Sequence, residues 1–190
     1  MDARSTLAVG VDVPWVTSWT AEAIEGVRPC QTVGGRLALG QAHRPGYGKP
    51  QYSKNHLVRQ RLSVLRMLCP MCGQPTAADD RWTEVAKRRT AGALRQSGAG
   101  GGLPAELANN RVLLDAGSIT PLHKRCVERS LAHCPHLKHE AEVKVIRFPP
   151  RWVVTPLMIE ATNAQGGVTP VVAFLQICGV TDAIDRRWAA

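Results

Sequence analysis

The sequence is poor in aromatic residues and has no long apolar run. Phe, Trp and Tyr make up 5% of its 190 residues, while it holds 17 Gly and 13 Pro. This composition predicts a modest core, much loop, and one domain with extensions or two small domains. No stretch approaches the roughly 20 apolar residues of a membrane-spanning helix. Residues 1–10 carry Asp2 and Arg4 rather than the apolar run of a signal peptide, so we expect a cytoplasmic protein with no membrane partner.

Acidic residues are missing from Gly26 to Ala78, where eight Lys and Arg residues occur, and the net charge of the chain is +9. A segment of one sign attracts polyanions, which indicates nucleic acid or an acidic protein surface as partner. A solvated basic face with no partner is the simpler alternative. The side chains that we expect to contact phosphate are Arg44, Lys49, Arg59, Arg61, Arg66, Lys124 and Arg125.

Two short motifs carry most of the chemical information. Residues 69–73 read Cys-Pro-Met-Cys-Gly, a spacing that places two thiols on one side of a tight turn, as tetrahedral zinc requires. Residues 120–126 read Thr-Pro-Leu-His-Lys-Arg-Cys, with Thr120 as a helix cap and Pro121 at the first helical position. An imidazole and a thiol three residues apart in a first helical turn lie on the same side. The motifs predict one structural Zn²⁺ bound by Cys69, Cys72, His123 and Cys126.

Other arrangements of the thiols remain open. Cys134 lies eight residues beyond Cys126, about 12 Å along an unbroken helix, whereas two thiolates on one zinc lie about 4 Å apart. Cys126 and Cys134 therefore cannot both bind unless the helix breaks between them, and Cys134 is kept as the alternative to His123. Cys69 and Cys72 could instead form a redox pair, but such a pair normally opens a helix that follows a strand. Two further cysteines, Cys30 and Cys178, fit no metal motif and are expected to be small buried side chains, and His133, His136 and His139 are expected at the surface.

The two motifs together resemble the treble-clef zinc finger, and Pro121–Cys126 resembles the last element of HNH-type endonucleases. The resemblance covers about 65 residues in two short blocks. It implies a zinc-centred fold and, in the nuclease family, a catalytic histidine between the two pairs of ligands. This chain has no histidine between Leu57 and Leu122, and its nearest acid is Asp115, while Asn109 and Asn110 cannot accept a proton as a general base. The chain thus resembles a degenerate finger that has lost nuclease activity.

Periodicity completes the expected architecture. Leu57, Val58, Leu62 and Leu65 recur at helical spacing within a helix from Ser53 to about Met67. Further helices are expected over Asp79–Gln96 and Pro121–His133, and strands over 111–114, 142–148, 152–161 and 168–178. We therefore predict an α+β fold with a treble-clef-like zinc core, flanking helices and a small C-terminal antiparallel sheet. Its parts are an extended N-terminal region (1–52), a zinc-binding helical core (53–140) and a β-rich C-terminal region (141–190).

The function predicted from the sequence is non-enzymatic: a zinc-binding protein whose basic face binds DNA or RNA, with no small-molecule substrate. The alternative is an accessory module for protein interaction or assembly, of viral or mobile-element type, in which Trp152, Phe174 and Trp188 form the interface. A third possibility is an enzyme whose metal site is open because His123 is not a ligand.

Overall fold

The computed structural model describes residues 3–134, 137, 145–163 and 166–188. The chain forms two compact units, one of Met1–Pro75 with Leu157–Phe174 and the other of Thr76–Pro156 with Leu175–Ala190. Two long strands, β9 (Trp152–Thr162) and β10 (Val168–Ile184), each contribute to both units. The three-part division expected from the sequence, with boundaries at 52 and 140, stays a prediction.

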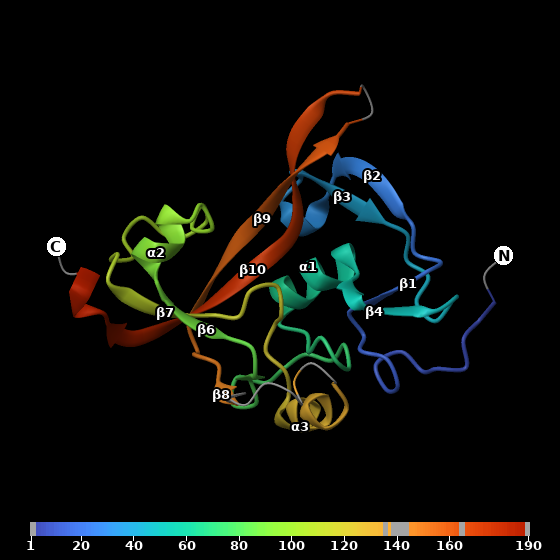
Figure 1. Ribbon diagram of the computed structural model, residues 1–190, viewed down its shortest axis with the longest axis horizontal. Coiled ribbons are helices and arrows are strands. Elements are labelled where there is room, and N and C mark those ends of the chain that lie inside the picture. The colour runs from blue at the N-terminus through green and yellow to red at the C-terminus, as the bar shows by residue number, and fades with distance from the viewer. Residues whose placement is uncertain (1–2, 135–136, 138–144, 164–165, 189–190) are drawn as a thin grey trace. The chain divides into compact units, whose positions relative to one another are not determined.

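Unit 1 contains short strands and one helix. Its elements are β1 (Thr17–Trp19), β2 (Ile24–Pro29), β3 (Leu37–Gln41), β4 (Pro50–Asn55) and helix α1 (Leu57–Arg66), with a 3-10 turn η1 over Gln31–Val33. Strands β1 and β4 pair antiparallel, and β2 and β3 form a hairpin whose second strand runs parallel to β10. Figure 1 shows β2 and β3 side by side at the N-terminal (blue) end of the colour scale.

Unit 2 contains β5 (Trp82–Thr83), β6 (Lys87–Thr90), helix α2 (Ala91–Gln96), β7 (Arg111–Asp115), helix α3 (Lys124–His133) and β8 (Ile146–Arg147), with a 3-10 turn η2 over Arg186–Trp188. Strand β7 pairs antiparallel with β6 on one side and with β10 on the other, and β5 pairs with β8. The core of this unit is a buried cluster of Ala91, Leu94, Leu113 and Cys178.

The expected fold class is wrong. Of the residues described, 39% are strand and 18% helix, and the order β2-β3-β10-β7-β6, with β9 paired to β10, makes a mixed six-stranded sheet. The protein is therefore mostly β, rather than a helix-flanked zinc core with a small C-terminal sheet. Strand β10 explains much of the difference, because Val171 to Gly179 are buried except for half-buried Phe174, as in a strand with neighbours on both sides.

The expected helix over Asp79–Gln96 is also wrong for most of its length. Its acidic start and basic end suit a helix dipole, but residues 87–90 pair with β7 in a register that sets Arg89 opposite Leu113. Only Ala91–Gln96 is helical, and the Thr90 hydroxyl accepts a hydrogen bond from the Ala93 amide at 3.1 Å as its cap. Residues 79–90 have the charge order of a helix but no apolar repeat every 3.6 residues. Pairing with β7 therefore makes residues 87–90 a strand.

Helix α1 buries charged side chains, which is unusual for a basic helix. Arg59 is 1% exposed, and its guanidinium donates to both carboxylate oxygens of Glu22 at 2.6 and 2.8 Å. Glu22 also accepts from the Trp19 amide at 2.9 Å. Burial by itself would raise the pKa of Glu22, but the hydrogen bonds and charge of Arg59 outweigh it and hold that pKa below its ordinary value.

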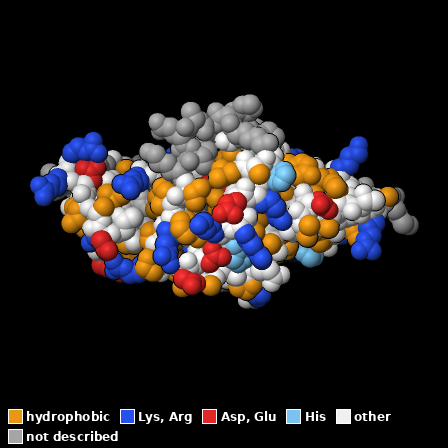
Figure 2. Space-filling model, turned by 90° about the horizontal axis from the view of Figure 1, so that it is seen from below, with side chains coloured by type: hydrophobic (Ala, Val, Ile, Leu, Met, Phe, Trp, Pro, Cys, Tyr) orange, Lys and Arg blue, Asp and Glu red, His pale blue; other side chains and the backbone are white. Residues whose placement is uncertain are grey.

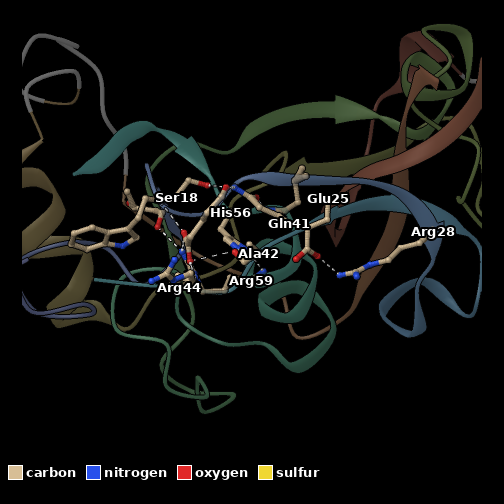
Figure 3. A network of polar contacts seen from close by, with 12 residues as sticks. Ser18, Glu25, Arg28, Gln41, Ala42, Arg44, His56 and Arg59 are labelled. Carbon is tan, nitrogen blue, oxygen red and sulfur yellow. Dashed lines mark hydrogen bonds and ion pairs between the residues drawn. The ribbon is translucent and has the colours of Figure 1, made fainter. Parts of the chain in front are cut away.

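His56 caps this helix from inside the same polar network (Figure 3). Its Nδ1 accepts from the Arg59 amide at 3.2 Å, so Nε2 carries the hydrogen and donates to the Ala42 carbonyl at 3.0 Å. Burial, followed by the charge of Arg59, lowers the pKa of His56 to about 4. His56 is thus neutral near pH 7, and the bidentate pair of Glu22 with Arg59 is the ionic centre of unit 1.

Replacing Glu22 with Gln tests this pair. Because the Arg59 charge would stay buried without a carboxylate, Glu22→Gln should lower the free energy of unfolding by about 3–5 kcal/mol. The matched control is Glu25→Gln, since Glu25 pairs with Arg28 at 2.7 Å where both side chains are about half exposed, and it should cost at most about 1 kcal/mol. Equal losses in urea unfolding would contradict a special role for the buried pair.

Candidate metal centre

The first pair of ligands lies on a tight turn that follows α1. The helix ends at Met67, which adopts a left-handed conformation (φ 49°). The chain then pairs with itself: Leu68 bridges to Pro75, and the Cys69 amide donates to the Gln74 carbonyl at 2.8 Å. The Gly73 amide donates back to the Cys69 carbonyl at 2.8 Å, with Gly73 at φ +75°. Backbone hydrogen bonds therefore fix both Cys69 and Cys72 on this turn.

The N-terminal segment of unit 1 supports the same turn. The Trp15 amide donates to the Met71 carbonyl at 2.8 Å, and the Val16 amide donates to the Pro70 carbonyl at 3.0 Å. A Cβ atom on Gly73 would lie 2.7 Å from the indole ring of Trp15. Glycine at this position thus satisfies both the positive φ and the close approach of the indole.

The second pair of ligands lies at the start of α3. The helix begins at Lys124, three residues later than the sequence predicted, because Leu122 pairs with Trp82 through two backbone hydrogen bonds of 2.8 and 2.9 Å and so stays extended. His123 is the residue before the first turn, and Asp80 accepts from the Lys124 amide at 2.8 Å. The imidazole makes no capping hydrogen bond, which leaves its orientation to be set by other contacts.

Four side chains converge as the motifs predicted. One ligand atom from each of Cys69, Cys72, His123 and Cys126 lies within 4.8 Å of the others, and the Cys126 sulfur lies 4.0 Å from His123 Nδ1. In a tetrahedral zinc site with Zn–S of about 2.3 Å and Zn–N of about 2.0 Å, ligand atoms are roughly 3.6–3.8 Å apart. Cys69 and Cys126 are buried, and Cys72 and His123 are half-buried. The donor types, number and spacing fit a metal ion that is soft enough for thiolates.

The alternative arrangements of the thiols differ from the positions that the structure shows. Cys134 is the residue at the end of α3, and the group of potential ligands among the described residues contains His123 instead. The turn that carries Cys69 and Cys72 opens no helix, unlike a typical redox pair, and all six cysteines are free of disulfides. His136 and His139 lie outside the residues that the structure describes.

Two of the arginines expected to contact phosphate are not on the surface. Arg59 is paired with Glu22, and Arg61 is 0% exposed. The Arg61 guanidinium donates to the carbonyl oxygens of Leu39 and Ala173, each at 2.8 Å. The expectation for Arg59 and Arg61 is therefore wrong, because the terminal guanidinium nitrogens of both side chains bind acceptors inside unit 1. The helical spacing that seemed to turn them outward did not account for a buried acid.

The other five basic residues are exposed: Arg44, Lys49, Arg66, Lys124 and Arg125. The Arg44 guanidinium lies over the Tyr47 ring at 5.1 Å, and the Lys124 ammonium over the Trp82 ring at 5.8 Å. On the face drawn in Figure 2, Lys and Arg side chains are interspersed with Asp and Glu. Of the aromatic residues considered for an interface, Trp152 is 36% exposed and Phe174 half-buried, whereas the Trp188 side chain is outside the description.

Comparison of the chain with protein-family models, with curated proteins and with solved structures finds no match. The resemblance to treble-clef and HNH-type fingers therefore rests on the two motifs and on the convergence of their four side chains. Within the described part of the chain, no helix has the length and apolar character needed to cross a membrane.

Gly73→Ala tests whether the turn that carries Cys69 and Cys72 requires a glycine at its end. Gly98 is a matched control because it has the same φ of +75°, yet no heavy atom lies within 4 Å of a Cβ placed there. Both changes should cost about 1–2 kcal/mol for the left-handed backbone. Gly73→Ala should cost about 1–3 kcal/mol more for the contact with Trp15, measured by chemical unfolding. Equal costs would show that the turn does not depend on the approach of Trp15.

Proposed function

We propose that this protein binds one Zn²⁺ through Cys69, Cys72, His123 and Cys126, and that the ion has a structural role. The observation that supports the proposal is the approach of four ligand atoms to within 4.8 Å. Three sulfurs and one imidazole nitrogen in a tetrahedral arrangement are typical of zinc. Four protein ligands leave no position for a water or a substrate, so the ion would stabilise the fold rather than activate a nucleophile.

The role that we propose for the protein as a whole is non-enzymatic binding of DNA or RNA. It is supported by the net charge of +9 and by the exposed cations beside the metal ligands, Lys124 and Arg125, together with Arg44, Lys49 and Arg66. A nuclease of HNH type would need a histidine as general base between the ligand pairs, and residues 58–121 contain none. An acidic protein surface is the competing partner, which the binding experiment below distinguishes.

The zinc proposal predicts the metal content of single variants. Elemental analysis of the purified protein should give one zinc per chain. Cys69→Ser and Cys126→Ser should lose the ion, because each removes a thiolate ligand, and a strong chelator should lower the melting temperature of the unmodified protein. Cys134→Ser is the matched control and should keep the ion. Zinc retained by Cys126→Ser, or lost by Cys134→Ser, would contradict the ligand set.

The nucleic-acid proposal predicts a change in salt dependence. The double variant Lys124→Ala/Arg125→Ala should weaken binding to labelled 20-nucleotide single strands and duplexes. It should also reduce the slope of log K against log salt by about 1.4–1.8, since each phosphate contact contributes roughly 0.7–0.9. The matched control is Lys87→Ala/Arg88→Ala, an exposed basic pair on β6 to which we assign no contact. Fluorescence anisotropy measures both.

Two outcomes would overturn the nucleic-acid proposal. The first is an absence of binding at 50 mM salt by zinc-loaded protein. The second is an equal loss in the two double variants, which would indicate non-specific attraction by net charge. With either outcome, the protein-interaction alternative would be favoured if the unmodified chain still captures an acidic protein after nuclease treatment.

A further inference from the structure

Trp82 is a half-buried tryptophan of β5 whose backbone is held on both sides. Its amide donates to the Leu122 carbonyl at 2.9 Å, and its carbonyl accepts from the Leu122 amide at 2.8 Å. On its other side, Trp82 pairs antiparallel with Arg147 of β8. An indole on a backbone held by two neighbouring segments has little freedom to lose when a planar ligand stacks on it.

Two exposed cations lie beside this indole, and the three side chains together are called the Trp82 surface. The Lys124 ammonium lies 5.8 Å from the centroid of the Trp82 ring. Arg147 is directly opposite Trp82 in the strand register, which places both side chains on one face of the strand pair. Among the described residues, neither cation has a carboxylate within ion-pair distance. Both charges are therefore available to an external anion.

Two acids adjoin the Trp82 surface without cancelling its charge. The Asp80 carboxylate accepts from the Lys124 amide at 2.8 Å at the start of α3, where the positive end of the helix offsets its charge. Asp79 is exposed, and its backbone carbonyl accepts from Arg147 Nη2 at 3.1 Å. Arg125, next to Lys124, adds another exposed cation. The surface therefore combines an aromatic ring with an excess of positive charge.

Trp152 differs from Trp82, although it also has a cation over its ring. The Arg81 guanidinium lies 4.9 Å from the centroid of that ring, but it donates to the Thr76 hydroxyl at 3.3 Å and to the Thr76 carbonyl at 3.2 Å. The adjacent Arg151 pairs with Asp182 at 2.8 Å. The cations beside Trp152 thus already have acceptors within the protein, which makes Trp152 a matched control for Trp82.

We infer that the Trp82 surface binds single-stranded nucleic acid, with one base stacked on the indole of Trp82 and neighbouring phosphates at Lys124 and Arg147. The inference rests on the proposed function and names the form of nucleic acid. Stacking requires an unpaired base, because the bases of a duplex are covered on both faces by their neighbours. Every base has a π face, so this contact tolerates any sequence. An acidic peptide would use the two cations without needing the indole.

The test compares two 20-nucleotide strands of equal charge, an oligothymidylate and an abasic strand with the same sugar-phosphate backbone. Fluorescence anisotropy measures their binding to the zinc-loaded protein. The oligothymidylate should bind roughly 5- to 100-fold more tightly, because the abasic strand cannot stack. Trp82→Leu should bring this ratio close to 1, since leucine has no aromatic face, and Trp82→Phe should keep part of it. The control Trp152→Leu should keep the whole ratio.

The outcomes separate this inference from the proposed function. Trp82→Leu should leave the slope of log K against log salt unchanged, because it removes no phosphate contact. The inference alone is overturned if the unmodified protein binds both strands equally, a comparison that needs no folded variant. It is also overturned if Trp82→Leu with its zinc retained keeps the ratio, or if a duplex or polyglutamate of equal charge competes as well as the oligothymidylate. Failure of both strands to bind at 50 mM salt would overturn the proposed function as well.

Discussion

The approach of three thiols and one imidazole to a common point is the constraint on which the proposed role depends. Thiolates this close repel one another, and burial disfavours their charge, so the arrangement is stable only with their protons retained or with a cation bound. The local backbone around each pair of ligands serves this arrangement. A hairpin-like turn with Gly73 fixes Cys69 and Cys72, and the extended Leu122 delays the start of α3 so that His123 precedes its first turn.

A buried charge must have a partner, and this requirement explains the surroundings of the two buried arginines of helix α1. Its sequence is basic, yet Arg59 and Arg61 are directed into unit 1 rather than toward a polyanion. Arg59 binds Glu22, and Arg61 lies among carbonyl oxygens, a hydroxyl and the Cys30 sulfur. Two basic side chains of one helix thus have buried partners of different kinds, a carboxylate for Arg59 and neutral oxygen acceptors for Arg61.

The sequence predicted the metal ligands because their spacing is local: two residues between thiols, and one helical turn between His123 and Cys126. Strands predicted over 111–114 and 152–161 lie within the observed Arg111–Asp115 and Trp152–Thr162. The size of the sheet was missed, because β6 pairs with β7 and β3 with β10 across distant parts of the chain. The burial of Arg59 was missed for the same reason: its partner Glu22 precedes the acid-free segment, and helical periodicity cannot locate it.

X-ray absorption at the zinc K-edge tests the central claim most directly, because it reports the atoms bound to the ion. The proposed site predicts a four-atom shell of three sulfurs at about 2.3 Å and one nitrogen at about 2.0 Å. A shell of four sulfurs would contradict His123 as a ligand. A shell without sulfur, or protein that binds no zinc at all, would contradict the account of the site.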